Sequence, residues 1–130
     1  MKFMRIMPAI LFLSAAVIMV SPGFAHPGDT PQLRLTAPNG GEVLLRGKPA
    51  MITWTSSGMP AGAEVVLVLY HRGIKTVVIC RNCPDKGRFQ WLIPAGTEPG
   101  AKYRIRIRWT SHPEINDFSD ADFQIRDNGH

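Results

Sequence analysis

The chain has 130 residues, of which 45% are hydrophobic and 19% are charged, and its 15 basic and 10 acidic residues give a net charge of +5. A chain of this length can bury one hydrophobic core and form one domain. Its basic excess is mild compared with the dense basic stripe of a dedicated nucleic-acid-binding protein, so we exclude that class of partner.

The N-terminal segment 1–25 is typical of an export signal. Lys2 and Arg5 precede a mostly apolar run, and Gly23-Phe24-Ala25 places small residues at the cleavage positions. The apolar run is shorter than the ~20 residues that a membrane-spanning helix needs. We therefore expect a cleaved signal peptide and a secreted or periplasmic protein that has no membrane contact after cleavage. A membrane anchor that is never cleaved is the alternative.

Cleavage would leave a mature chain that begins at His26. The loss of the signal removes two basic residues and no acidic one, so the net charge falls to +3. Residues 26–31 are rich in Pro, Gly and Asp and predict a flexible arm, and residues 32–127 predict one domain. No stretch of this domain sustains a helical period. Alternating apolar residues and turn residues instead predict strands at residues 32–37, 43–45, 50–56, 64–71, 74–80, 88–93, 101–110 and 122–126.

Two of these segments show how the strands are arranged. Residues 64–71 are apolar on both faces, which predicts a central strand, and Arg72-Gly73 predicts a two-residue hairpin turn after it. Residues 101–110 alternate most regularly. One face carries Tyr103, Ile105, Ile107 and Trp109, and the other carries Lys102, Arg104, Arg106 and Arg108.

Seven or eight short strands separated by turns predict an all-β fold. We expect an Ig-like or fibronectin-III-like antiparallel β-sandwich of about seven strands. Trp54 shares one strand face with Ile52, so we assign its ring to the core. The segment Pro38 to Glu42 predicts a tight turn, because Asn and Gly accept positive φ at little cost.

The series from Leu33 to Arg126 resembles the Ig-like domain at the N-terminus of the yeast KRE/KNH-type cell-wall synthesis proteins. That domain also occurs in the Ser/Thr-rich GPI-anchored family and in many bacterial secreted proteins. The resemblance implies an Ig-like sandwich associated with the cell envelope or with carbohydrate, and it brings no catalytic residues. The matching residues are Pro38, Asn39, Gly40, Gly41, Glu42, Gly47, Ile52 to Trp54, Leu69, Tyr70, Gly87, Trp91 to Pro94, Tyr103 to Ile105, Ser119 to Phe123, and Ile125.

The cysteines of the chain are Cys80 and Cys83. In an exported protein they predict a local disulfide, which we place across the turn between two strands. A redox site is the first alternative, although a thioredoxin-like motif belongs at the start of a helix. A zinc site is the second, with His71 as the nearest further ligand.

Other metal sites and catalysis have weaker support. The amine and imidazole of His26 would suit copper if His71, His112 or His130 lay opposite, but a plain polar terminus is the simpler interpretation. Asp117, Asp120 and Asp122 cluster before the last strand and could give oxygen ligands to calcium, without the spacing of an EF-hand. No nucleophile motif or phosphate loop is present, so we expect no enzymatic activity and no cofactor.

The basic strand face gives the remaining candidate site. Arg104, Arg106 and Arg108 could bind an acidic glycan or a phosphate-bearing polymer, and the simpler alternative is a solvated sheet face. Trp91 and Trp109 could stack on sugars, although their alternation favours the core.

Three functions therefore remain open. The first is a non-catalytic exported module associated with the cell envelope or with extracellular carbohydrate. The second is a periplasmic copper carrier that uses His26. The third is a protein–protein interaction module of an envelope assembly. An envelope glycan or an envelope protein would accordingly be the partner.

Overall fold

The computed structural model describes residues 30–128, and the N-terminal segment expected to be a signal peptide lies outside them. The described residues form strands and include no helix that is long and apolar enough to cross a membrane. The prediction of an all-β fold is confirmed. The strands are β1 (Gln32–Ala37), β2 (Val43–Leu45), β3 (Pro49–Ser57), β4 (Glu64–His71), β5 (Ile74–Pro84), β6 (Arg88–Leu92), β7 (Gly100–Trp109), β8 (His112–Phe118) and β9 (Phe123–Arg126).

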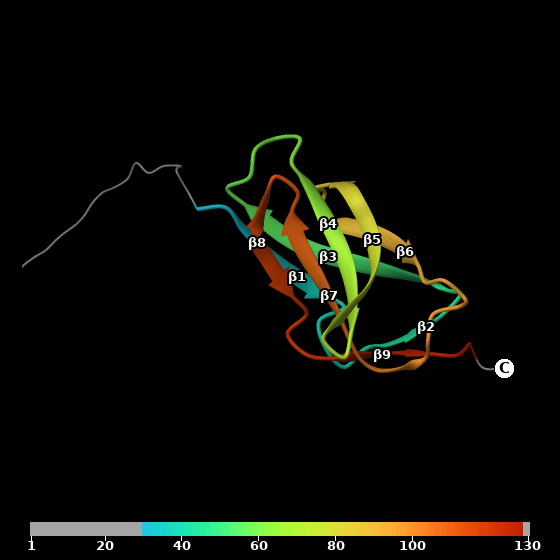
Figure 1. Ribbon diagram of the computed structural model, residues 1–130. Helices are drawn as coiled ribbons and strands as arrows, with labels where there is room; N and C mark the ends of the chain where they lie inside the picture. Colours follow the sequence, from blue (N-terminus) through green and yellow to red (C-terminus); the bar gives the residue numbers. More distant parts are fainter. Residues whose placement is uncertain (1–29, 129–130) are drawn as a thin grey trace, which may run out of the picture. The chain divides into compact units, whose positions relative to one another are not determined.

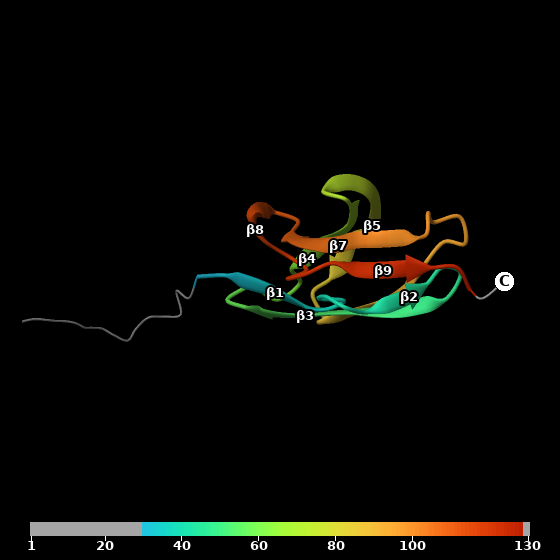
Figure 2. The ribbon, with the colours of Figure 1, turned by 90° about the horizontal axis from the view of Figure 1, so that it is seen from below.

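These strands make two sheets that face each other. The smaller sheet has the order β1-β3-β6, and the larger has the order β2-β9-β7-β4-β5, with β8 also paired to β7 (Figure 1). Figure 2 shows the two layers edge-on, with β1 and β3 in one layer and β7 and β9 in the other. Pairing is antiparallel except between β2 and β9, which run parallel.

The core lies between the two layers because alternate residues of each strand point inward. Trp54 and Trp91 come from the smaller sheet and are 3% and 5% exposed, and Tyr103 and Phe123 from the larger sheet are still more buried. The apolar alternation read in the sequence is thus the alternation between core and outer face. Further core residues are Leu33, Leu35, Ile52, Val65, Leu67, Leu69, Ile93, Ile105, Ile107, Trp109 and Ile125.

The central strand predicted at residues 64–71 is β4, which lies between β5 and β7. Its core-facing residues alternate with Val66 and Val68, which point to the outer face of the sheet. Both valines are nevertheless buried, with exposed fractions of 4% and 2%. The outer face of the larger sheet is therefore covered by neighbouring side chains at this point.

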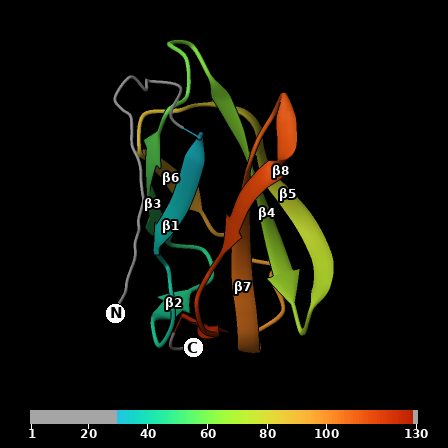
Figure 3. The same cartoon turned by 90° about the vertical axis from the view of Figure 1, so that its left-hand side faces the viewer.

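The chain changes sheet between β1 and β2 (Figure 3). β1 pairs with β3 in the smaller sheet, whereas β2 pairs with β9 in the larger one. The turn at residues 38–42 makes this crossover, and the peptide bond before Pro38 is cis. Gly40 has a φ of 146°, and a Cβ atom there would lie 2.7 Å from the Cβ of Ala121. Only glycine fits this close approach to the segment before β9.

A tyrosine corner fixes the connection from β6 to β7. The hydroxyl of Tyr103 donates a hydrogen bond to the backbone carbonyl of Glu98, five residues earlier. On the other sheet, Trp54 Nε1 donates to Asp85 Oδ1 at 2.8 Å. Both large aromatic residues thus bury their rings and satisfy their polar atoms, as buried Tyr and Trp normally do.

The sequence pattern did not predict the strand β8. Its residues His112–Phe118 include Pro113, Asn116 and Asp117, which have low strand propensity. It forms because β7 offers a free ladder edge and because Ile115 packs against the core.

The strand β5 is also longer than predicted, and both cysteines lie inside it. Cys80 and Cys83 are joined by a disulfide, as predicted, but both lie within β5 and not across a turn. Val65 pairs with Cys83 and Leu67 with Cys80, so three steps along β5 oppose two along β4. This bulge shortens the strand locally and brings the two Cα atoms within 6.0 Å. An edge strand tolerates both the bulge and Pro84.

We predict that Tyr103→Phe lowers the free energy of unfolding by about 0.5–1.5 kcal/mol, the usual net value of one hydrogen bond. Burial, and secondarily the Glu98 carboxylate, raise the pKa of Tyr103. The folded state therefore holds this proton more tightly than the unfolded chain does. The associated stability is complete below pH ~10 and is lost as the pH rises further.

Urea unfolding of both proteins at several pH values checks this prediction. The wild-type protein should lose stability more steeply than Tyr103→Phe above pH ~10. Parallel curves across the whole range would show that the Tyr103 hydroxyl is not held as described.

Candidate functional site

The outer face of the larger sheet carries the arginines that the sequence singled out. They alternate along β7, and each lies directly opposite a residue of β4. Cross-strand neighbours project their side chains to the same side of a sheet, with Cβ atoms about 5 Å apart. The pairs are Arg104 with Tyr70, Arg106 with Val68, and Arg108 with Val66. We call this surface, defined by Arg104, Arg106 and Arg108 over β4, the basic face.

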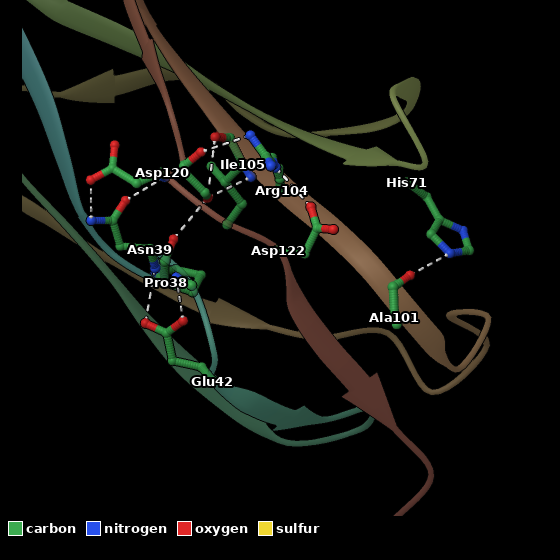
Figure 4. A network of polar contacts seen from close by, with 11 residues as sticks. Pro38, Asn39, Glu42, His71, Ala101, Arg104, Ile105, Asp120 and Asp122 are labelled. Carbon is green, nitrogen blue, oxygen red and sulfur yellow. Dashed lines mark hydrogen bonds and ion pairs between the residues drawn. The ribbon is translucent and has the colours of Figure 1, made fainter.

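Arg104 is held in place by the segment between β8 and β9. Its Nε donates to Asp122 Oδ1 at 2.7 Å, and its guanidinium also donates to the backbone carbonyl of Ser119 at 3.4 Å (Figure 4). The side chains of this ion pair are 44% and 45% exposed. The charge of Arg104 is therefore partly compensated by a carboxylate, while its position is fixed.

Arg106 and Arg108 are half-buried, and their side chains also take part in the packing of the sheet. Arg106 Nε donates to Asn116 Oδ1 at 3.2 Å, and its guanidinium carbon lies 5.7 Å from the centre of the Phe118 ring. These arginines lie directly opposite Val68 and Val66, both of which are buried, so we infer that the aliphatic stems cover the two valines. The three arginines are thus not equivalent, and two of them are part of the packing of the sheet.

A hollow of about 620 Å³ lies at one end of the basic face. Its lining includes two aromatic rings, Tyr70 and Phe118, whose centres are 5.1 Å apart at an interplanar angle of 68°. Cationic side chains from β7 and from the β4–β5 turn also line it. We call this the basic hollow; its lining residues are Tyr70, Arg72, Gly73, Lys102, Arg104, Phe118 and Asp122.

Most of the basic hollow was not predicted from the sequence. Lys102 could have been found, because it shares the outward face of its strand with Arg104. Arg72 was assigned only to a turn, and Tyr70 only to the family pattern. Phe118 lies in β8, which was not predicted, so no signal in the sequence placed it beside Tyr70.

The turn at residues 38–42 is stabilised by hydrogen bonds within itself and to the segment before β9. The Glu42 carboxylate accepts hydrogen bonds from the backbone N–H groups of Asn39 and Gly40, at 2.9 and 2.8 Å. Asn39 Nδ2 donates to Asp120 Oδ2 at 2.9 Å, and the Asp120 N–H returns a bond to Asn39 Oδ1 at 2.7 Å (Figure 4). We call Pro38 to Glu42 with Ser119 to Asp122 the crossover network.

The carboxylates considered for calcium do not converge on one point. Asp117 Oδ2 accepts the N–H of Leu35 at 2.8 Å, Asp120 pairs with Asn39, and Asp122 pairs with Arg104. No group of three or more His, Cys, Asp or Glu side chains among residues 30–128 is arranged to hold a metal ion. Each carboxylate instead joins two parts of the sandwich.

The cysteines and the described histidines take part in contacts within the fold. The Cys80–Cys83 disulfide leaves no free thiol in the part of the chain that is described. The ring of His71 stacks on Tyr103 at 4.0 Å, with its Nε2 placed 3.0 Å from the Ala101 carbonyl oxygen (Figure 4). His112 lies against Trp109, at the opposite end of β7. His26 and His130, the other members of the copper hypothesis, lie outside the described residues.

The two tryptophans considered for sugar stacking belong to the core. Trp91 and Trp109 are 5% and 8% exposed, which leaves little ring surface for a ligand. The exposed aromatic surface of the larger sheet comes instead from Phe118, which is 38% exposed and lies in the basic hollow.

The fold is an Ig-like β-sandwich, and the motif at residues 38–42 makes hydrogen bonds that stabilise it. The chain belongs to the family of Kre9/KNH-like N-terminal Ig-like domains, whose model matches residues 37–125. Domains of this kind are structural or binding modules, and such folds are typically non-catalytic. No curated protein matches the chain.

Several solved structures are similar to this chain, and two of them share low identity with it. The fibronectin(III)-like modules of Clostridium thermocellum CbhA share 14% identity at a TM-score of 0.48, with 87% of this chain and 51% of that chain covered. This chain thus spans about half the length of the CbhA structure. The CARDB domain of the PF1109 protein from Pyrococcus furiosus, in complex with di-metal ions, shares 17% identity at a TM-score of 0.36, with 75% and 87% covered. Neither likeness carries a functional argument.

We predict that the arginines of the basic face differ in their effect on stability. Arg106→Ser or Arg108→Ser should expose Val68 or Val66 and cost about 1 kcal/mol, the value for roughly 40 Å² of newly exposed apolar surface. Arg104→Ser removes an exposed ion pair and one long hydrogen bond, and should cost about 0–1 kcal/mol. The Arg→Gln variants, which keep part of the aliphatic stem, should lie closer to wild type.

Urea unfolding of the single variants measures these differences. Equal losses for Ser and Gln at positions 106 and 108 would contradict a covering role for the stems. An Arg104→Ser variant less stable than both others would contradict the assignment of Arg104 to an exposed ion pair.

Proposed function

We propose that this protein is an exported, non-catalytic binding module that attaches to an anionic polymer of the cell envelope or to an extracellular acidic carbohydrate. Family membership supports a structural or binding module associated with the cell wall. The observation that carries the proposal is the gathering of cations on one face of the larger sheet. They are Arg72, Lys102, Arg104, Arg106 and Arg108, of which Arg104 is paired with a carboxylate.

The arrangement of these cations suits a polymer better than a single small ion. Alternate residues of a strand lie about 7 Å apart on one face, so Arg104, Arg106 and Arg108 form a row of regularly spaced charges. A polyanion with repeating charges can contact the whole row at once. The stems of Arg106 and Arg108 are already ordered by packing, which lowers the entropic cost of binding at these positions.

The test is co-sedimentation of the exported protein with an insoluble, carboxylate-bearing envelope polysaccharide and with an insoluble neutral glucan. The variant Arg104→Gln/Arg106→Gln/Arg108→Gln should lose most of the binding to the acidic polymer while it stays folded. The matched control Lys48→Gln/Lys86→Gln/Arg88→Gln removes the same charge from exposed positions away from the basic face. It should bind nearly as well as wild type.

Salt provides the second measurement. Exposed charges are screened within about 8 Å at physiological ionic strength, so binding should weaken steadily as salt is added. Equal loss in both triple variants would mean that only the net charge matters, and would refute the basic face. Binding to the neutral glucan alone, or capture of an envelope protein in place of the polymer, would overturn the proposal.

A further inference from the structure

The basic hollow contains two residues whose backbone conformation is unusual for their type. Arg72 and Lys102 have φ angles of 55° and 68°, and they are the non-glycine residues with positive φ in the described part of the chain. This region of φ is uncommon for residues with a side chain and is found at sites where surrounding structure enforces it. The Arg72 N–H donates to the Lys102 carbonyl at 2.9 Å, so the two positions are directly joined.

Neither position needs a cation for the fold. Arg72 is the first residue of the two-residue turn between β4 and β5, and Gly73 also has positive φ. Turns of this geometry favour Asn-Gly, because Asn accepts positive φ more readily than Arg. Lys102 lies at an irregularity of the β7–β9 pairing, where Asn or Gly would also be the less strained choice. The cationic side chains are thus kept at a cost in local stability.

The lining of the basic hollow also contains aromatic surface, from Tyr70 and Phe118. The rings of Tyr70 and Phe118 stand at 68° to each other and form a corner. Arg106 lies over the Phe118 ring, and Arg104 is compensated by Asp122. Arg72 and Lys102 have no carboxylate among the hydrogen bonds and ion pairs of the described residues, so their charges remain available to a ligand.

We propose that the basic hollow binds one acidic sugar unit of the polymer, a hexuronate, with the sugar ring against Tyr70 and Phe118 and the carboxylate toward Arg72 and Lys102. This inference rests on the proposed function and names the ligand class for one end of the basic face. Aromatic rings pack well against the apolar face of a sugar, whereas a bare phosphate chain gains nothing from them. Two uncompensated cations side by side favour an anion over a neutral sugar.

The test titrates the exported protein with three soluble probes: trigalacturonate, the neutral cellotriose, and tripolyphosphate, which carries charge without a sugar ring. Trigalacturonate should bind, and the other two should bind at least ten-fold more weakly. Tyr70→Leu, which removes the phenol and its ring, should weaken trigalacturonate at least five-fold while leaving tripolyphosphate unchanged.

The strained positions offer a test that separates binding from folding. Arg72→Asn and Lys102→Asn should each weaken trigalacturonate binding at least ten-fold, with a melting temperature equal to or above that of wild type. Arg88→Asn, an exposed cation on the outer face of the smaller sheet, is the matched control and should leave binding unchanged. Binding that survives both Asn variants would refute the assignment of the carboxylate to Arg72 and Lys102.

The remaining outcomes distinguish this inference from the function on which it rests. Equal binding of tripolyphosphate and trigalacturonate would overturn the sugar assignment. If trigalacturonate does not bind but the acidic polysaccharide still sediments the protein, the hexuronate inference fails and the proposed function stands. If neither binds, both fail.

Discussion

Ser119 lies where the two halves of the sandwich are joined, and the residue is 1% exposed. Its hydroxyl accepts a hydrogen bond from the N–H of Ile105 at 3.0 Å and donates one to the carbonyl of Pro38 at 2.8 Å (Figure 4). One edge of β7 is paired with β9 at Tyr103 and with β8 from Arg106 onward, so Ile105 falls in the gap between these two strands. The side chain of Ser119 fills this gap in the ladder. The same side chain therefore completes the larger sheet and holds the crossover from the smaller one.

The crossover network is also connected to the basic face. The N–H of Gly41 donates to the carbonyl of Asp122 at 2.9 Å, and the carboxylate of Asp122 accepts from Arg104. The turn at residues 38–42 thus holds Asp122 directly, just before β9 begins, and Asp122 sets the position of Arg104 on the basic face. This chain of contacts connects the turn to the position of Arg104.

Much of the fold could be predicted from the sequence, because it depends on local alternation and turn chemistry. The bounds of β1, β2 and β4 agree with the prediction, and the outward placement of Arg104, Arg106 and Arg108 followed from the period of two along β7. The features that could not be predicted depend on contacts distant in the sequence. β8 forms only because β7 offers a partner, and the strand conformation of Cys80 to Pro84 depends on a bulge against β4. The covering of Val66 and Val68 by arginine stems, and the positive φ of Lys102, likewise leave no signal in a single sequence.

The most direct test of this account is the free energy of unfolding of Ser119→Ala, measured in urea beside Ser57→Ala, which removes an exposed hydroxyl at the end of β3. Loss of the Ser119 hydroxyl leaves the Ile105 N–H and the Pro38 carbonyl without their partner, and each buried unpaired group costs about 1–3 kcal/mol. We predict that Ser119→Ala loses at least about 2 kcal/mol, whereas Ser57→Ala stays within about 0.5 kcal/mol of wild type. A Ser119→Ala variant as stable as Ser57→Ala would contradict the claim that this hydroxyl joins the two sheets.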